Sequence, residues 1–190
     1  FSYELDLLEL FKYDHGEAFR NTDDIQFSIQ ASKGRVGKLI VFDTMSLDLN
    51  PTDLDKSTIG QGSLGNGLTV NTSTHKVHAD GAAVITMTLT TPTYLASIDI
   101  VDLDHGSMSL TAYDANGVKL GHLHMDSDPI RVKTLQVGMT ATTFVLNFRD
   151  SFVMLPHFRG FGHGETFNTL TLLAKLPGTL GGCTTTDEEA

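Results

Sequence analysis

Two segments alternate apolar and polar residues with a period of two, and this alternation constrains the fold more than any other feature of the chain. Residues 83–90 carry a threonine at every second position near their end, and residues 143–148 repeat the alternation with larger apolar side chains. A strand with one face on a core and the other toward water has this period. The apolar members, which we expect to be buried, are Ile85, Met87, Leu89, Phe144, Leu146 and Phe148.

Further short segments have the same character. The remaining strand candidates are residues 38–42, 67–71, 95–101, 107–113, 118–124, 131–137 and 167–174. Stretches rich in Gly, Asp, Asn and Pro separate them, and Asn116-Gly117 suits a tight type I′ or bulged hairpin turn. Residues 3–11 fit both a strand and a helical stripe, and we interpret them as a strand. So many short strands predict an all-β fold, an antiparallel β-sandwich of the jelly-roll type.

The chain length suits one domain. Its 190 residues match the size of a single β-sandwich. We therefore expect one domain over residues 1–176 and a Gly/Thr-rich acidic tail or linker over residues 177–190. That tail has little apolar surface of its own, so we expect it to lie against another copy or a neighbouring domain of a surface assembly. Cys183 is the only cysteine, so no disulfide forms within the chain.

The charge of the chain excludes two classes of partner. Thirteen Lys and Arg residues against 23 Asp and Glu residues give a net charge of -10. This charge repels a phosphate backbone and an anionic lipid surface, so we expect no nucleic acid partner. No apolar run approaches the roughly 18 residues that span a bilayer, so we expect no membrane insertion.

Acidic residues gather after the strand candidate at residues 38–42. The segment that follows residue 42 carries oxygen donors at Asp43, Asp48, Asn50, Asp53 and Asp55. Calcium takes six to eight oxygen ligands from flexible loops, so this segment predicts a calcium site. It is not an EF-hand, because the glycine at the sixth loop position and the terminal glutamate are both missing.

A second acidic pair lies at Asp102 and Asp104. With a period of two, both residues continue the row of Ile98 and Ile100, which we expect to face inward. Two carboxylates at the end of such a row repel each other unless a cation or hydrogen-bond donors meet them. Calcium is one interpretation. The other is that the strand ends by Val101 and both acids are solvated or cap backbone amides.

The order of these motifs resembles that of calcium-dependent, galactose-binding-like sandwich modules in bacterial and algal surface proteins. The resemblance rests on residues 38–43, 50–55, 98–104 and 109–117, and on a closing segment, 165–172, that is similar to the Phe-Asp-Asn-Leu ending of such modules. It implies a carbohydrate-binding-module-like domain with structural calcium, non-catalytic and part of a larger secreted chain. The chain lacks the Gly-Gly pair that often stands in the Asn-Pro-Thr loop.

A later loop gathers aromatic, basic and imidazole side chains among glycines. A sugar-binding patch combines a flat ring with polar groups that fix hydroxyls. The candidates for such a patch are His157, Phe158, Arg159, Phe161 and His163. The alternative is that the two Phe rings pack under the sandwich.

Two weaker motifs complete the candidates. His122 and His124 share one strand face and suit a zinc pair if residues 157–165 supply a third ligand; otherwise they are solvated or hydrogen-bonded. Asn71 begins a glycosylation sequon.

The sequence favours a binding or structural role over catalysis. It contains no Gly-rich phosphate loop, nucleophile elbow or HExxH motif. We therefore expect a non-enzymatic extracellular or cell-surface module, stabilised by calcium, that acts in surface adhesion or in structural assembly, including assembly into a filament. The alternatives are a glycan-binding, lectin-like module and a carbohydrate-active enzyme that uses two carboxylates.

Overall fold

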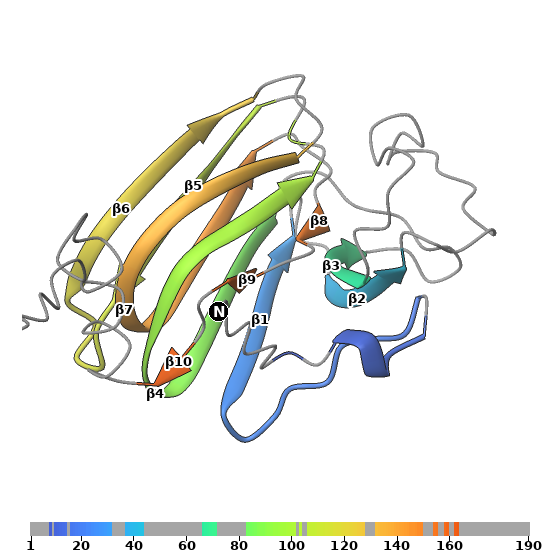
Figure 1. The fold of residues 1–190 in the computed structure, drawn as a ribbon, viewed down its shortest axis with the longest axis horizontal. Helices are drawn as coiled ribbons and strands as arrows, with labels where there is room; N and C mark the ends of the chain where they lie inside the picture. Colours follow the sequence, from blue (N-terminus) through green and yellow to red (C-terminus); the bar gives the residue numbers. More distant parts are fainter. Residues whose placement is uncertain are drawn as a thin grey trace, which may run out of the picture.

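Antiparallel strands make up nearly all of the regular structure, as the alternation predicts (Figure 1). The computed structural model describes residues 8, 10–14, 16–31, 37–43, 66–71, 83–101, 103, 106–127, 132–149, 154–155, 158–159 and 162–163. Within these residues, one short 3₁₀ helix, η1 (Leu10–Lys12), precedes the strands. The strands are β1 (Ile25–Ala31), β2 (Lys38–Asp43), β3 (Asn66–Asn71), β4 (Ala83–Val101), β5 (Ser107–Tyr113), β6 (Lys119–Asp126), β7 (Val132–Arg149), β8 (Met154–Leu155), β9 (Phe158–Arg159) and β10 (Gly162–His163).

Two long strands, β4 and β7, pass through both layers of the sandwich. Figure 1 shows both strands doubling over near the lower end of the view. Residues 83–90 of β4 and 142–149 of β7 form the first layer with β1, β5 and β6, in the order β1, β4, β7, β5, β6. Residues 93–101 of β4 and 132–141 of β7 form the second layer with β2, β3, β8, β9 and β10. The fold class is therefore confirmed as an antiparallel β-sandwich.

The bends in β4 and β7 have local causes. Thr88 pairs with Thr143 and Thr93 pairs with Ala141, so four residues of β4 lie opposite one residue of β7. Pro92 belongs to these four, and proline has no N–H to donate to a ladder. A second register shift leaves Gly138 with a φ of 60°, in the left-handed region that favours glycine. Extra residues of this kind bend a strand and increase its twist.

These bends correct the expected strand boundaries. The segments expected as separate strands at 83–90 and 95–101 are two halves of β4, and those at 131–137 and 143–148 are two halves of β7. Pairing continues through each bulge, although proline and glycine interrupt the alternation in the sequence. The segment expected at 118–124 runs over Lys119–Asp126, and the one at 167–174 lies outside the described residues.

The core lies between the two layers, where the alternation places it. All six residues expected to be buried are buried. They belong to one apolar cluster with Leu39, Leu68, Ile98 and Leu135 of the second layer. Because the cluster draws on both layers, each layer packs its apolar face on the other.

An N-terminal segment packs against this core. Tyr13 stacks on Phe19 at 5.5 Å between ring centroids, and Phe19 meets the edge of Phe27 at 5.3 Å. The Asn66 side-chain amide donates to the carbonyls of Leu10 (2.9 Å) and Tyr13 (3.1 Å). The strand expected over residues 3–11 is therefore wrong at its described end, where Asn66 satisfies carbonyls of a 3₁₀ turn and not of a sheet.

Other expectations are untested. The tail over residues 177–190, with Cys183, lies outside the described residues, as does the junction at residue 176. Asn71 ends β3, and its backbone pairs with Lys38. Among the described residues, the structure contains no helix with the length and apolar character needed to cross a membrane.

Candidate functional site

Of the expected calcium ligands, the backbone of one lies in a described strand. Asp43 is the last residue of β2, and its backbone pairs with Asn66. Its side chain, and all of Asp48, Asn50, Asp53, Asp55, Asp102 and Asp104, lie outside the described residues.

The ends of β2 and β4 set the distance between the points where the two acidic loops begin. Val101, at the end of β4, lies in one row with Met154, Thr69 and Ile40. Three strand spacings, about 14 Å, therefore separate the end of β4 from β2. A calcium ion shared by the loops after these strands stays a prediction.

The expected sugar-binding loop is described at three of its positions. Phe158 pairs with Ile98, and its partly buried ring packs against the core. The backbones of Arg159 and His163 pair with Ser97 and Thr93 on the same edge of β4. Their side chains, His157 and Phe161 lie outside the described residues, so the patch itself stays untested.

The two histidines of β6 lie in the first layer with hydrogen-bond partners of their own. His122 Nδ1 lies 2.9 Å from Thr111 Oγ1, and His124 Nε2 lies 2.9 Å from Asp126 Oδ1. Within the described part of the chain, no three His, Cys, Asp or Glu side chains come together in a group that could hold a metal. The third zinc ligand was expected from residues 157–165, whose side chains, apart from Phe158, are outside that part.

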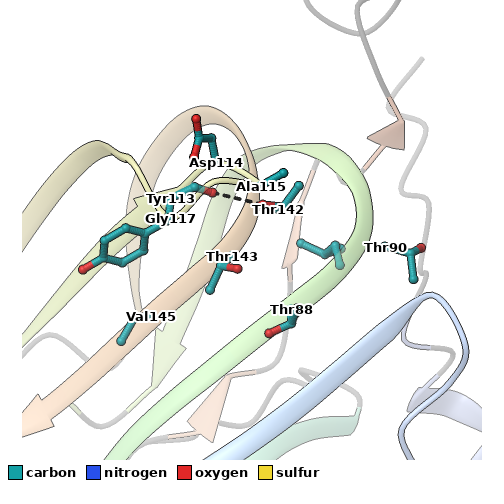
Figure 2. Close-up of a pocket in the computed structure, with 10 residues that line it drawn as sticks. Thr88, Thr90, Tyr113, Asp114, Ala115, Gly117, Thr142, Thr143 and Val145 are labelled. Atoms are coloured by element: carbon teal, nitrogen blue, oxygen red, sulfur yellow. Dashed lines mark hydrogen bonds between the residues drawn. The ribbon is translucent and has the colours of Figure 1, made fainter.

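A groove of about 560 Å³ lies where the first layer meets the bends (Figure 2). Three segments enclose it: the end of the first half of β4, the start of the second half of β7, and the hairpin between β5 and β6. We call it the Tyr113 groove, and its lining residues are Thr88, Leu89, Thr90, Tyr113, Asp114, Ala115, Gly117, Thr142, Thr143 and Val145.

The hairpin that carries Tyr113 is fixed by its turn chemistry. Asp114 Oδ1 accepts hydrogen bonds from the backbone N–H groups of Asn116 (2.9 Å) and Val118 (2.8 Å). Gly117 has a φ of 78° and donates its N–H to the Asp114 carbonyl, which closes the bulged form of the predicted turn. The hairpin is therefore confirmed, and it holds Tyr113 at the end of β5 with little freedom.

A further contact ties this hairpin to the bend of β7. The Thr142 hydroxyl donates to the Tyr113 carbonyl at 3.4 Å, drawn as the dashed line in Figure 2. Tyr113 pairs with Thr143, and Figure 2 shows the Tyr113 ring on the side of the groove where Thr143 and Val145 lie. The ring, the threonine hydroxyls and the Val145 methyl groups thus belong to one surface.

The groove presents hydroxyls, one phenol ring and one carboxylate. Thr88 and Thr90 are exposed, and Tyr113, Thr143 and Val145 are half-buried. Asp114 is the single acid among the lining residues that the structure describes, and one of its oxygens already holds the turn. Such a set recognises a neutral polar molecule with an apolar side better than a cation or a strong anion.

Sequence reasoning did not identify this groove. The alternating threonines and the Asn-Gly turn were both visible in the sequence, but each predicts only local structure. Thr88, Tyr113 and Thr143 become neighbours through the order β4, β7, β5, and that order is not encoded in any local pattern.

Comparisons with known proteins leave the family open. No family model matches the chain, and no curated protein matches it. Some solved structures show a likeness at low identity. The lectin domain of lectinolysin, solved with Lewis B antigen, is 9% identical over 77% of this chain and 100% of that chain, with a TM-score of 0.40.

Two further structures are similar at the same level. The module CpGH89CBM32-6 from Clostridium perfringens is 12% identical over 75% of this chain and 96% of that chain, with a TM-score of 0.39. A fucose-binding module of Streptococcus pneumoniae is 12% identical over 71% of this chain and 100% of that chain, with a TM-score of 0.37. Likenesses at this level assign neither a family nor a ligand, so the site must be judged on its own residues.

Proposed function

We propose that this chain is a non-catalytic glycan-binding module and that the Tyr113 groove is its binding site. The observation that supports this proposal is the placement of the Tyr113 ring beside Thr143 and Val145 in one open groove, whose opposite side carries Thr88 and Thr90. The volume of about 560 Å³ lies within the range of about 300–1,000 Å³ that is usual for small-molecule sites.

The chemistry of the groove matches that of a sugar ring. A pyranose has an apolar C–H face and a rim of hydroxyls, so it needs a flat apolar partner and groups that both donate and accept hydrogen bonds. An aromatic ring supplies the first, and threonine and tyrosine hydroxyls supply the second. Val145 extends the apolar contact next to the ring.

The same residues favour binding over bond cleavage. Glycoside hydrolysis needs two carboxyl groups on opposite sides of the scissile bond. Within the described part of the chain, the lining residues offer one, Asp114, whose Oδ1 accepts two backbone hydrogen bonds in the turn. A groove with this composition holds a sugar without supplying an acid and a base.

A role outside the cell fits this proposal. Glycan binding is one physical basis for the surface adhesion expected from the sequence, and calcium at the acidic loops would act as a stabiliser and not as a sugar ligand. The calcium ligands lie outside the described part of the chain, so the calcium site stays a proposal with a test of its own.

A glycan array followed by titration calorimetry tests the proposal. The variants are Tyr113→Ala, Tyr113→Phe and, as a matched control, Phe11→Ala, which removes an aromatic ring that is 71% exposed and outside the groove. We expect Tyr113→Ala to weaken binding about tenfold or more, which is about 1.4 kcal/mol. Tyr113→Phe should retain most of the affinity, and Phe11→Ala all of it.

Two results would contradict the proposal. One is an array on which the unaltered protein retains no glycan. The other is a sugar that binds Tyr113→Ala as tightly as the unaltered protein, since that sugar would occupy a different site.

A further inference from the structure

The Tyr113 groove opens onto a broad, uncharged face of the first layer. Residues that alternate with the buried core residues point to this face. At one end the alternation reaches the charged residues Asp126 and Arg149. The residues before that end are Gln26, Ser28, Gln30, Val84, Thr86, Thr88, Ser109, Thr111, Tyr113, His122, His124, Thr143, Val145 and Asn147. We call this set the outer face.

The strand register arranges the outer face in straight rows. One row runs Ser28, Thr86, Val145, Thr111, His122 across all five strands. The row beside it contains Gln26, Thr88, Thr143 and Tyr113, three of which line the groove. The groove is therefore continuous with the outer face and is not a separate cavity.

The outer face is neutral in a strongly acidic protein. The chain carries a net charge of -10, yet none of the fourteen residues of the outer face is Asp, Glu, Lys or Arg. Charged side chains begin at its margins, with Lys119 beside Tyr113 and Arg149 and Asp126 beside Ser107. A neutral polar surface offers no attraction to a charged polymer, so it suits an uncharged chain rich in hydroxyls.

The side chains of the outer face are also suited to a long ligand. Ser and Thr are short and lose little rotamer freedom when they are covered. Along the row that contains Val145, Thr111 and His122, two strand spacings, about 10 Å, separate Val145 of the groove from His122. That span is longer than one sugar residue, so a ligand that reaches both positions has more than one residue.

His122 is held in place at the far end of this span. Its Nδ1 lies 2.9 Å from Thr111 Oγ1, which bridges β5 and β6 on the outer face. An imidazole oriented in this way presents its other nitrogen to a ligand as a hydrogen-bonding group.

We infer that the ligand of the Tyr113 groove is a linear, uncharged polysaccharide that lies across the strands from the groove to Thr111 and His122. This inference rests on the proposed function, because it names the substrate class of the same site. The groove is the main subsite and holds one sugar residue. Thr111 continues the row from Val145 of the groove, and His122 beyond it completes the remote subsite, which longer chains reach.

The test is a chain-length series measured by titration calorimetry. The probes are neutral cello-, laminari- and xylo-oligosaccharides of one to six residues, with a polyuronic acid oligomer as the charged comparison. We expect affinity to rise about tenfold or more as at least one neutral series lengthens. His122→Ala and Thr111→Val should remove this rise, whereas Gln136→Ala, an exposed amide on the second layer, should keep it.

The outcomes separate this inference from the proposed function. A neutral series with the same affinity at every length, or a rise that both remote variants retain, overturns the inference and leaves the groove as a site for a single sugar. Tighter binding of the polyuronic acid also overturns it. If no saccharide binds in the series or on the array, the proposed function and the inference fail together.

Discussion

Gly117→Ala is a substitution whose cost can be worked out from backbone conformation alone. A Cβ added at Gly117 meets no atom within 4 Å, so no steric clash contributes. The residue has a φ of 78°, a conformation that costs an L-residue about 1–2 kcal/mol. Alanine also restricts the unfolded chain, which offsets about 0.4–1 kcal/mol of that cost. We therefore expect the free energy of unfolding to fall by about 1 kcal/mol.

Urea unfolding followed by circular dichroism measures this change, with Gly117→Asn as the matched control. Asparagine tolerates the left-handed region better than alanine, so its loss should be clearly smaller. For a chain of this size, about 1 kcal/mol lowers Tm by about 2–4 °C. Full stability of Gly117→Ala, or an Asn variant as unstable as the Ala variant, would show that backbone conformation is not what selects glycine here.

Three further predictions concern other parts of the molecule. Asp99 is 4% exposed and accepts a 2.7 Å hydrogen bond from Thr134 Oγ1. Thr134→Val should therefore lower the free energy of unfolding by about 1 kcal/mol. An unchanged urea midpoint would mean that water replaces this bond without cost. If calcium binds the acidic loops, calcium at a hundred times its Kd should add about 2.7 kcal/mol to the free energy of unfolding. The double variant Asp53→Asn, Asp55→Asn should lose this gain. Equal Tm values in calcium and in chelator would exclude the calcium site. Deletion of residues 177–190 should leave the sandwich folded and weaken self-association in light scattering, and undiminished association would make the tail a linker only.

The features of this fold that can be predicted from the sequence are those that depend on local residue patterns. Burial of Met87 and Phe144 follows from alternation, because each strand of the first layer has one face on the core and one toward water. The hairpin follows from Asn116-Gly117, since few residues other than glycine adopt the required φ. Neither inference needs any knowledge of which strands are neighbours.

Other features depend on information that local patterns do not contain. Pro92 and Gly138 look like ends of strands, but here they mark bulges through which pairing continues. β1 was not expected as a strand, although Ile25 and Phe27 alternate with polar residues as clearly as those of β4 do. The groove and the outer face depend on strand order and register, which arise only when the whole sheet forms.

The bent strands also dictate an order of assembly. Along the β4–β7 ladder, the pair nearest in sequence is Val101 with Val132, in the second layer, and the most distant is Ala83 with Phe148, in the first. Closing the shorter loop costs less entropy, so we expect pairing to start in the second layer and to extend through the bend into the first. The β5–β6 hairpin lies inside that loop and must already be compact when the ladder passes it. Because each long strand belongs to both layers, we expect that neither layer detaches alone and that amide protons in both exchange through one shared opening.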